Sequence, residues 1–224
     1  NKYSYVMNNP MKYVDPDGKE PVKSQAGTVS TFIDVMNNSR TQIGKTVGLD
    51  AENALLRLGY VEVEWIYKVI PKITPATTPY FNDKNGRYIY TEKGGWIDMT
   101  HFLFYAGEGY NFKINGFENP IGEALQDGFW QEKVYDSLYA GQSGYSYEDL
   151  PSDKFGADFA VNYFDPSSNL NLGEQIQKYL KEQLGATDPQ NAPNYDNLPE
   201  VADLSDTPSR QNKTTTPVYT KNNP

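Results

Sequence analysis

The chain contains a single histidine, His101, which stands among carboxylate and aromatic residues at helical spacing. A helix that begins near Met99 places three side chains on one face, at i, i+4 and i+7: His101, Tyr105 and Glu108. Asp98 precedes this helix, at or near its N-cap. A histidine beside carboxylates can act as a general base with an orienting acid, or as one ligand of a divalent metal. The alternative is a helix start capped by Asp98, with His101 packed and hydrogen-bonded.

Glu132 is the second candidate, because its place on a predicted helix conflicts with its charge. At 100° per residue it falls on the apolar stripe formed by Ile121, Leu125 and Gly128. A carboxylate that faces a core is costly unless it is paired, hydrogen-bonded or bound to a metal. Desolvation raises the pKa of such a carboxyl group, which suits proton transfer. The alternatives are a structural salt bridge or a different helix phase.

The stretch SYEDLPSD, residues 146–153, offers two further carboxylates, Glu148 and Asp149. Both can be catalytic, but acidic residues at a helix start more often cap its unpaired amides, and we expect capping for Asp149. The role of Glu148 stays open. The predicted site therefore joins Asp98, His101, Glu132 and Glu148, with Glu108 as a further member. His101 and Glu132 are the predicted ligands of a divalent metal, if one is used.

Composition excludes several other kinds of site. The chain has no cysteine, so thiolate catalysis and cysteine-ligated zinc are ruled out. One histidine excludes a two-histidine zinc site within the chain. A phosphate-binding glycine loop, a GxSxG elbow, an HExxH helix and a dinucleotide fingerprint are all missing. The net charge of −9 disfavours nonspecific nucleic-acid binding, although a metal-dependent nuclease remains compatible with it. No apolar run is long enough to span a bilayer.

The elements that must position these residues are mostly helical. We expect helices over 28–70 in two parts, from Met99 to about Tyr110, over 119–139, and over about 171–184. A further helix follows one of two overlapping start signals, Ser146 or Ser152. Residues 60–70 fit either a strand or a continuing helix. Aromatic-rich arms around Asn85-Gly86 predict a β-hairpin within 79–98, because this dipeptide suits the positive φ of a tight turn.

The predicted organisation has three parts: a turn-rich linker at 1–22, a globular domain at 23–185, and a polar tail at 186–224 that is extended or disordered, or lies along the domain surface. The fold class is α+β, predominantly α-helical, with a small antiparallel β-hairpin. The first residue is not Met and no signal peptide follows it, so we expect a piece of a longer polypeptide.

The opening stretch YSYVMNNPMKYVDPDGKEP resembles the end of the RHS/YD-repeat core, whose pattern is Y-x-Y-x-x-N-N-P-x-x-x-x-D-P-x-G. The matching residues are Tyr3, Tyr5, Asn8, Asn9, Pro10, Asp15, Pro16 and Gly18. In that family the motif borders a variable C-terminal domain, frequently a toxin delivered to competing cells. The resemblance implies a secreted or cell-surface parent protein, an RHS shell as partner, and a cognate immunity protein. Lys19 replaces the leucine after which some members are cleaved.

The rest of the chain resembles an uncharacterised bacterial domain family with three motifs. The first, G-G-[FW]-I-D-x-x-H, matches Gly94 to Asp98 and His101. The second matches Trp130 and Glu132, with Gln131 where that family often has histidine. The third, S-x-[FY]-S-x-E-D-L-x-S-[ND]-x-x-G, matches Ser143 to Gly156. No activity comes with this resemblance, but its motifs coincide with the candidate residues.

These observations predict a C-terminal effector domain of an RHS-type toxin that acts as a hydrolase. His101 would be the base or a metal ligand, and Glu132 a second ligand or an acid. The substrate can be peptidoglycan, peptide or nucleic acid, and the acidic pI argues against the last. The competing hypothesis is a non-enzymatic module that binds a partner or a cell surface.

Overall fold

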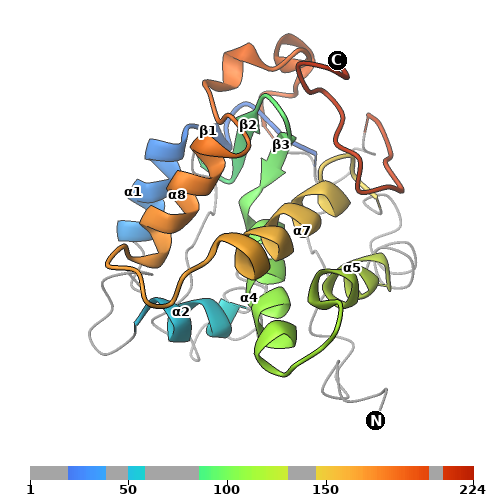
Figure 1. Cartoon of the computed structure of the whole chain (residues 1–224). Helices are drawn as coiled ribbons and strands as arrows, with labels where there is room; N and C mark the ends of the chain where they lie inside the picture. The colour runs from blue at the N-terminus through green and yellow to red at the C-terminus, as the bar shows by residue number, and fades with distance from the viewer. Residues whose placement is uncertain (1–19, 39–49, 59–85, 131–144, 202–208) are drawn as a thin grey trace, which may run out of the picture.

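The computed structural model describes residues 20–38, 50–58, 86–130, 145–201 and 209–224. Its elements form a helical body with a three-stranded sheet at one end (Figure 1). The fold is therefore α+β and predominantly helical, as the sequence predicts. None of the helices in these ranges is long and apolar enough to cross a membrane.

The sheet has the order β1-β2-β3, with β1 at Ala26–Gly27, β2 at Tyr88–Thr91 and β3 at Gly95–Asp98. β2 and β3 are antiparallel, with Tyr88 opposite Asp98 and Thr91 opposite Gly95, whereas β1 joins β2 in parallel. The hairpin turn among the described residues thus lies at 92–94. Gly86 has the positive φ expected at Asn85-Gly86, +108°, and donates its N–H to the carbonyl of Gln25. Asn85 and the first predicted arm lie outside the described residues, so a hairpin turn at Asn85-Gly86 stays a prediction.

The helices follow the predicted periodicity closely. Within the described ranges the longer helices are α1 Val29–Asn38, α2 Ala51–Leu58, α4 Met99–Ile114, α5 Pro120–Trp130, α7 Asp149–Asp158, η3 Phe159–Tyr163 (a π-helix) and α8 Leu172–Glu182. α4 begins at the predicted residue and runs four residues further than expected. Pro120 starts α5, where a missing N–H has no intrahelical acceptor to lose. Asn171 and Glu174 form a capping box at the start of α8. The predictions for 60–70 and 131–139 fall outside the described residues.

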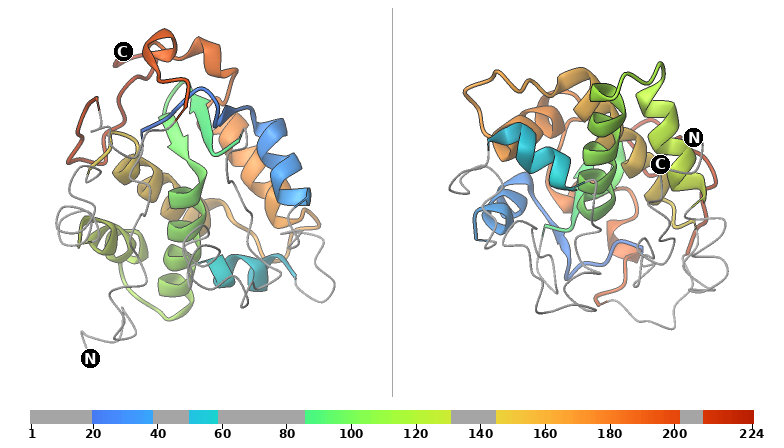
Figure 2. Two further views of the ribbon diagram at one scale, coloured as in Figure 1. Left: turned by 180° about the vertical axis from the view of Figure 1, so that it is seen from behind. Right: turned by 90° about the horizontal axis from the view of Figure 1, so that it is seen from below.

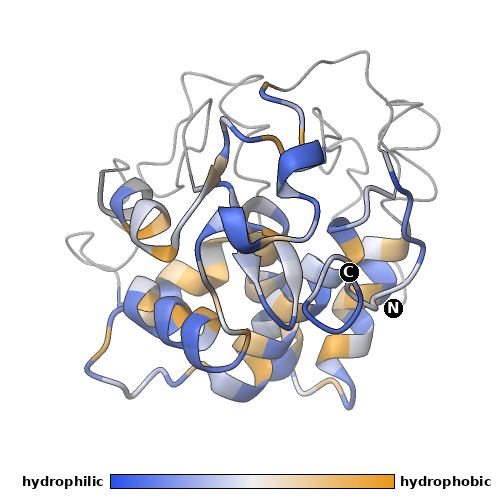
Figure 3. Ribbon diagram, turned by 90° about the horizontal axis from the view of Figure 1, so that it is seen from above, coloured by the Kyte–Doolittle hydropathy of each residue, from blue (hydrophilic) through white to orange (hydrophobic). Residues whose placement is uncertain are grey.

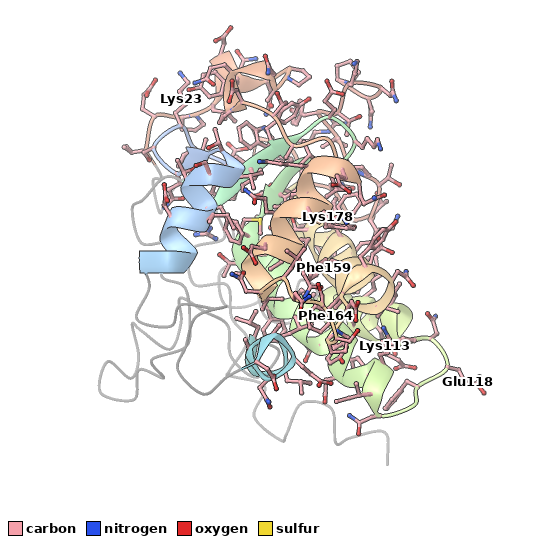
Figure 4. All side chains as sticks on the ribbon, turned by 60° about the vertical axis from the view of Figure 1, so that its left-hand side comes forward. Lys23, Lys113, Glu118, Phe159, Phe164 and Lys178 are labelled. Carbon is pink, nitrogen blue, oxygen red and sulfur yellow. The ribbon has the colours of Figure 1, made fainter. Side chains whose placement is uncertain are left out.

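The sheet separates two apolar cores because side chains alternate along its strands. Ile89 of β2 and Ile97 of β3 face the main core, which fills the space between α1, α2, α4, η3 and α8. Tyr88, Tyr90 and Trp96 point the other way. Figure 4 marks Phe159 and Phe164, aromatic residues of this main core, whose rings lie 6.2 Å apart.

The second core is completed by the C-terminal part of the chain. Ala192, Leu198 and Val218 are buried there against Tyr147 and the aromatic face of the sheet. The chain forms two short 3-10 helices on the way, η4 Pro189–Asn191 and η5 Tyr195–Asn197, whose outer residues are hydrophilic (Figure 3). Within 186–201 and 209–224 the tail therefore lies along the domain.

Helices α4 and α7 pack against each other more closely than ordinary side chains permit. A Cβ at Gly156 of α7 would lie 2.2 Å from the carbonyl oxygen of Phe102 on α4. At Gly109 a Cβ would lie 3.0 Å from the Cα of Ala157. The two backbones approach because glycine occupies both positions. This contact sets the relative position of the first turns of α4 and α7.

We expect Gly156→Ala to lower the free energy of unfolding by about 2 kcal/mol, because the new methyl group would meet a backbone carbonyl that cannot rotate away. Gly109→Ala should have a smaller effect, since its contact is less severe and alanine favours a helix. Denaturant titration measures both. Asp34→Asn, an exposed change on α1, is the control and should leave the free energy of unfolding unchanged. A Gly156→Ala protein as stable as wild type would contradict the proposed close packing.

Candidate functional site

His101 lies in the first turn of α4, where it meets the first turns of α7. Its Nδ1 is 2.8 Å from Oδ1 of Asp153, and the two side chains are only 8% and 1% exposed. A bond of this length to a carboxylate places the proton of the neutral ring on Nδ1. Nε2 is then the ring atom that gains or loses a proton. A histidine oriented in this way by a buried carboxylate has the geometry of a general base.

Asp149 stands on the other side of the imidazole. Its Oδ1 lies 3.7 Å from His101 Nε2, and it is 3% exposed. Asp149 and Asp153 are separated by one helical turn, so both project from the same face of α7 towards α4. The sequence predicted Asp149 as a capping residue, whereas the structure brings its carboxylate beside the imidazole. Two flanking carboxylates stabilise the imidazolium form that a base generates during reaction.

Asp98 has a structural partner on either side. Its Oδ1 accepts a hydrogen bond from the backbone of Thr100, which makes it the N-cap of α4. Its Oδ2 accepts from Nε and Nη2 of Arg87, at 3.1 and 3.0 Å, and both residues are 1% exposed. The capping alternative for Asp98 is therefore confirmed. Because both oxygens of this carboxylate accept hydrogen bonds, from Arg87 and from the amide of Thr100, Asp98 fixes the start of α4.

Glu148 is buried one residue before α7, next to this ion pair. Its Oε2 accepts from the hydroxyl of Ser146 at 2.8 Å, and Oε1 is buried without a partner. Burial raises its pKa, with the negative charge of Asp98 as a further contribution. Ser152 joins the two residues, since its Oγ accepts from the Asp98 amide and donates to the Glu148 carbonyl. Glu148 does not hydrogen-bond to His101, contrary to the predicted convergence of these two residues.

Glu108, the further sequence candidate, pairs with a carboxyl group on α5. Its side chain is hydrogen-bonded to that of Asp127. Burial, together with the negative charge of neighbouring acids, raises the pKa of Glu108 well above its usual range and that of Asp127 to about 8. The two groups therefore share a proton at neutral pH.

The proton-sharing pair adjoins the His101–Asp153 contact. The negative charge of Asp153 contributes to the raised pKa of Glu108. The pKa of Asp153 itself is raised by burial, and its interaction with His101 partly offsets that rise. Asp153 Oδ2 is also buried without a partner, and a Cβ at Gly128 of α5 would lie 2.5 Å from it. Gly128 thus leaves space for this carboxylate. These acids and the single histidine come from helices α4, α5 and α7, which pack against one another (Figure 2).

The predicted site is only partly reproduced among the described residues. His101 and Asp98 lie at the start of α4 and Glu148 lies next to Asp98, but Glu132 falls outside the described residues. Asp153 and Asp127 were not predicted. The i, i+4 spacing of Asp149 and Asp153 on a helix was the available signal for the first. Asp127 had no such signal, because its role depends on the packing of α5 against α4.

Among the described residues, no three histidine, aspartate or glutamate side chains are grouped so as to hold a metal ion. A surface pocket of about 370 Å³ lies elsewhere, between the end of η3 and α8, lined by residues that include Tyr163, Leu170 and Lys178. His101 contacts α7 near its start, whereas this pocket lies beyond the other end of α7, at the end of η3. We therefore place the candidate site at the His101–Asp153 contact.

Comparison of the chain with protein-family models, with curated proteins and with solved structures finds no match.

The Glu108–Asp127 pair predicts that stability falls as the pH rises. The folded state holds a proton on this pair up to about pH 8, whereas the unfolded carboxyl groups lose theirs near pH 4. The folded state therefore binds about one more proton in between, and the free energy of unfolding decreases across that interval, by up to about 1.4 kcal/mol per pH unit. Asp127→Asn should reduce this slope, as measured by urea titration at pH 5 and pH 8.

Asp34→Asn, at an exposed position on α1, is the control and should leave the slope unchanged. An Asp127→Asn slope identical to that of wild type would show that Glu108 and Asp127 do not hold the proton.

Proposed function

We propose that this chain is the C-terminal effector domain of an RHS-type toxin and that it is a hydrolase with His101 as general base. The observation that carries the catalytic proposal is the 2.8 Å contact between His101 Nδ1 and buried Asp153, made across the α4–α7 interface. A buried acid that fixes the tautomer of a single histidine is the arrangement that base catalysis requires. The RHS assignment is supported by the N-terminal motif from Tyr3 to Gly18.

In the proposed reaction, Nε2 of His101 accepts a proton from a water molecule, and the resulting hydroxide attacks the scissile bond. Asp153 holds Nδ1–H and thereby keeps the Nε2 lone pair oriented. The positive charge that forms on the ring is stabilised by Asp153 and by Asp149, 3.7 Å from Nε2. The proton then returns from Nε2 to the leaving group.

The charges around His101 favour an uncharged scissile bond over a phosphodiester. Asp98, Glu148, Asp149 and Asp153 are all nearly fully buried near the starts of α4 and α7, where Arg87 is paired with Asp98. Among the described residues, a phosphate here would meet these acids, while Arg87 is already paired with Asp98. The net charge of −9 acts in the same direction. We therefore favour peptidoglycan or peptide as the substrate over nucleic acid.

A metal-assisted form of the same proposal assigns His101 and Glu132 as ligands. A histidine nitrogen with carboxylate oxygens suits Zn²⁺ or Mn²⁺, and Asp153 would be the outer acid that orients the ligating ring. The ion would supply a Lewis acid. Tight binding of either ion to the isolated protein, lost in His101→Ala, would support this form.

Expression toxicity tests the proposal. The chain is produced in bacteria, either in the cytoplasm or exported to the periplasm, as wild type, His101→Ala and Asp153→Asn. We expect wild type to inhibit growth in the compartment that holds its substrate and His101→Ala to be harmless, because loss of a general base lowers the rate by roughly 100-fold or more. Asp153→Asn should be strongly impaired, and the exposed Asp34→Asn fully active.

Equal harm from wild type and His101→Ala would overturn the catalytic role of His101 and support the non-enzymatic partner-binding alternative. Harm from neither protein in either compartment would contradict the effector proposal. Circular dichroism of each variant establishes that the fold is retained.

A further inference from the structure

The C-terminal segment 209–224 lies beside the turn that leads into α7. In two opposite views its trace passes next to residues 145–148 and then over the sheet (Figures 1 and 2). Ser146 forms an antiparallel bridge with Gln211, and the amide of Asn212 donates to the carbonyl of Tyr145 at 3.0 Å. Residues separated by more than sixty positions in sequence are thus directly connected.

Asn212 is the most fully hydrogen-bonded side chain of this segment. Its Nδ2 donates to the carbonyl of Tyr147 at 3.1 Å and to that of Thr216 at 2.9 Å. Its Oδ1 accepts from the amide and the hydroxyl of Thr214, at 3.1 and 2.8 Å. Asn212 is 8% exposed. Each of its side-chain donors and acceptors therefore has a partner, and three of these four hydrogen bonds lie within its own segment.

The turn that Asn212 holds has an unfavourable backbone conformation. Tyr145 has φ +65°, in the left-handed region that side chains other than glycine seldom occupy. Such a residue is roughly 1–2 kcal/mol less favourable than in an ordinary conformation and is kept there by its surroundings. Asn212 binds the carbonyl groups on both sides of Ser146: its backbone amide donates to Tyr145 and its side chain to Tyr147. Without these bonds, the turn loses restraints that oppose its relaxation.

Aromatic contacts reinforce the same connection. The ring of Tyr219 packs edge-on against Tyr147 at 4.9 Å, and the guanidinium of Arg210 lies 5.1 Å from the Tyr219 ring. The hydroxyl of Tyr147 accepts from Asn194 at 3.2 Å. Val218 approaches β3 so closely that a Cβ at Gly95 would lie 2.2 Å from its carbonyl oxygen.

The restrained turn continues directly into the acids of the candidate site. Ser146 donates to Glu148, and its carbonyl accepts from the amide of Asp149, the first residue of α7. Asp149 then faces His101 Nε2. A shift of the turn is therefore transmitted to Asp149 within one helical turn, whereas Asp153, a turn further along α7, is held by the α4–α7 contact.

We propose that Asn212 is a positioning residue: by clamping the 145–147 turn, it fixes Asp149 opposite His101, so that the C-terminal segment is part of the site. The catalytic meaning of this inference rests on the proposed hydrolase function. The geometric claim does not depend on it. The inference gives the polar C-terminal segment a specific role that its composition does not indicate.

The single histidine allows a direct test by NMR, because its ring signals need no assignment among several. The full chain, labelled with ¹⁵N-histidine, is titrated with acid as wild type, Asn212→Ala and Asp149→Asn. In wild type the carboxylate beside Nε2 favours the charged ring. We expect Asn212→Ala to lower the pH of half-titration of His101 by about half a unit or more, in the same direction as Asp149→Asn. Lys221→Ala, an exposed change in the same segment, should leave it unchanged.

A purely structural role would lower the melting temperature of Asn212→Ala and leave the His101 titration as in wild type, and that result would overturn the inference. If Asn212→Ala does not fold, Thr214→Val replaces it, because it removes the hydroxyl that donates to Asn212 Oδ1 and accepts from the amide of Thr216. The titration of Thr214→Val should shift in the same direction, and an unchanged titration contradicts the proposal. A shifted titration in a chain that shows no toxicity would uphold the clamp and reject the hydrolase.

Discussion

The close approach of α4 and α7 is the constraint on which the rest of the structure depends. Gly156 lies against the carbonyl of Phe102, and Gly109 lies against Ala157, so the two helices meet along their backbones. This contact brings the first turn of α4 to the acidic face of α7. The 2.8 Å contact between His101 and Asp153 follows from it. A wider spacing would break that contact before it affected either helix, because a hydrogen bond tolerates far less displacement than an apolar contact.

The second feature of this interface is its excess of acidic groups. Asp98 accepts hydrogen bonds from Arg87 and from the amide of Thr100 at the start of α4. Asp153 is hydrogen-bonded to His101. Glu108 and Asp127 have each other as partner, and a shared proton reduces their mutual repulsion. Glu148 keeps one oxygen without a partner. Groups so placed are costly for stability, and proteins retain such arrangements most often where proton transfer is needed.

The sequence was sufficient for the parts that depend on local chemistry. Asp98 and Met99 mark the start of α4 and Pro120 the start of α5, because caps and prolines act within one turn. The single histidine indicated where the candidate site lies. The pairing of His101 with Asp153 could not be predicted, since it depends on how two helices distant in sequence pack. Asp149 was expected to cap its helix, and a capping role gives no sign of a contact with His101. The parallel β1–β2 pairing and the clamp by Asn212 are likewise nonlocal and leave no periodic signal.

The central claim is that Asp153 holds the Nδ1 proton of His101, so that Nε2 carries out proton transfer. The most direct measurement is the pair of ring ¹⁵N chemical shifts of His101 in the neutral form, recorded for wild type and Asp153→Asn. The account predicts a neutral ring protonated at Nδ1 in wild type, with a proton signal that exchanges slowly and is lost in Asp153→Asn. A neutral ring that carries its proton on Nε2, or shifts that are the same in both proteins, would contradict it.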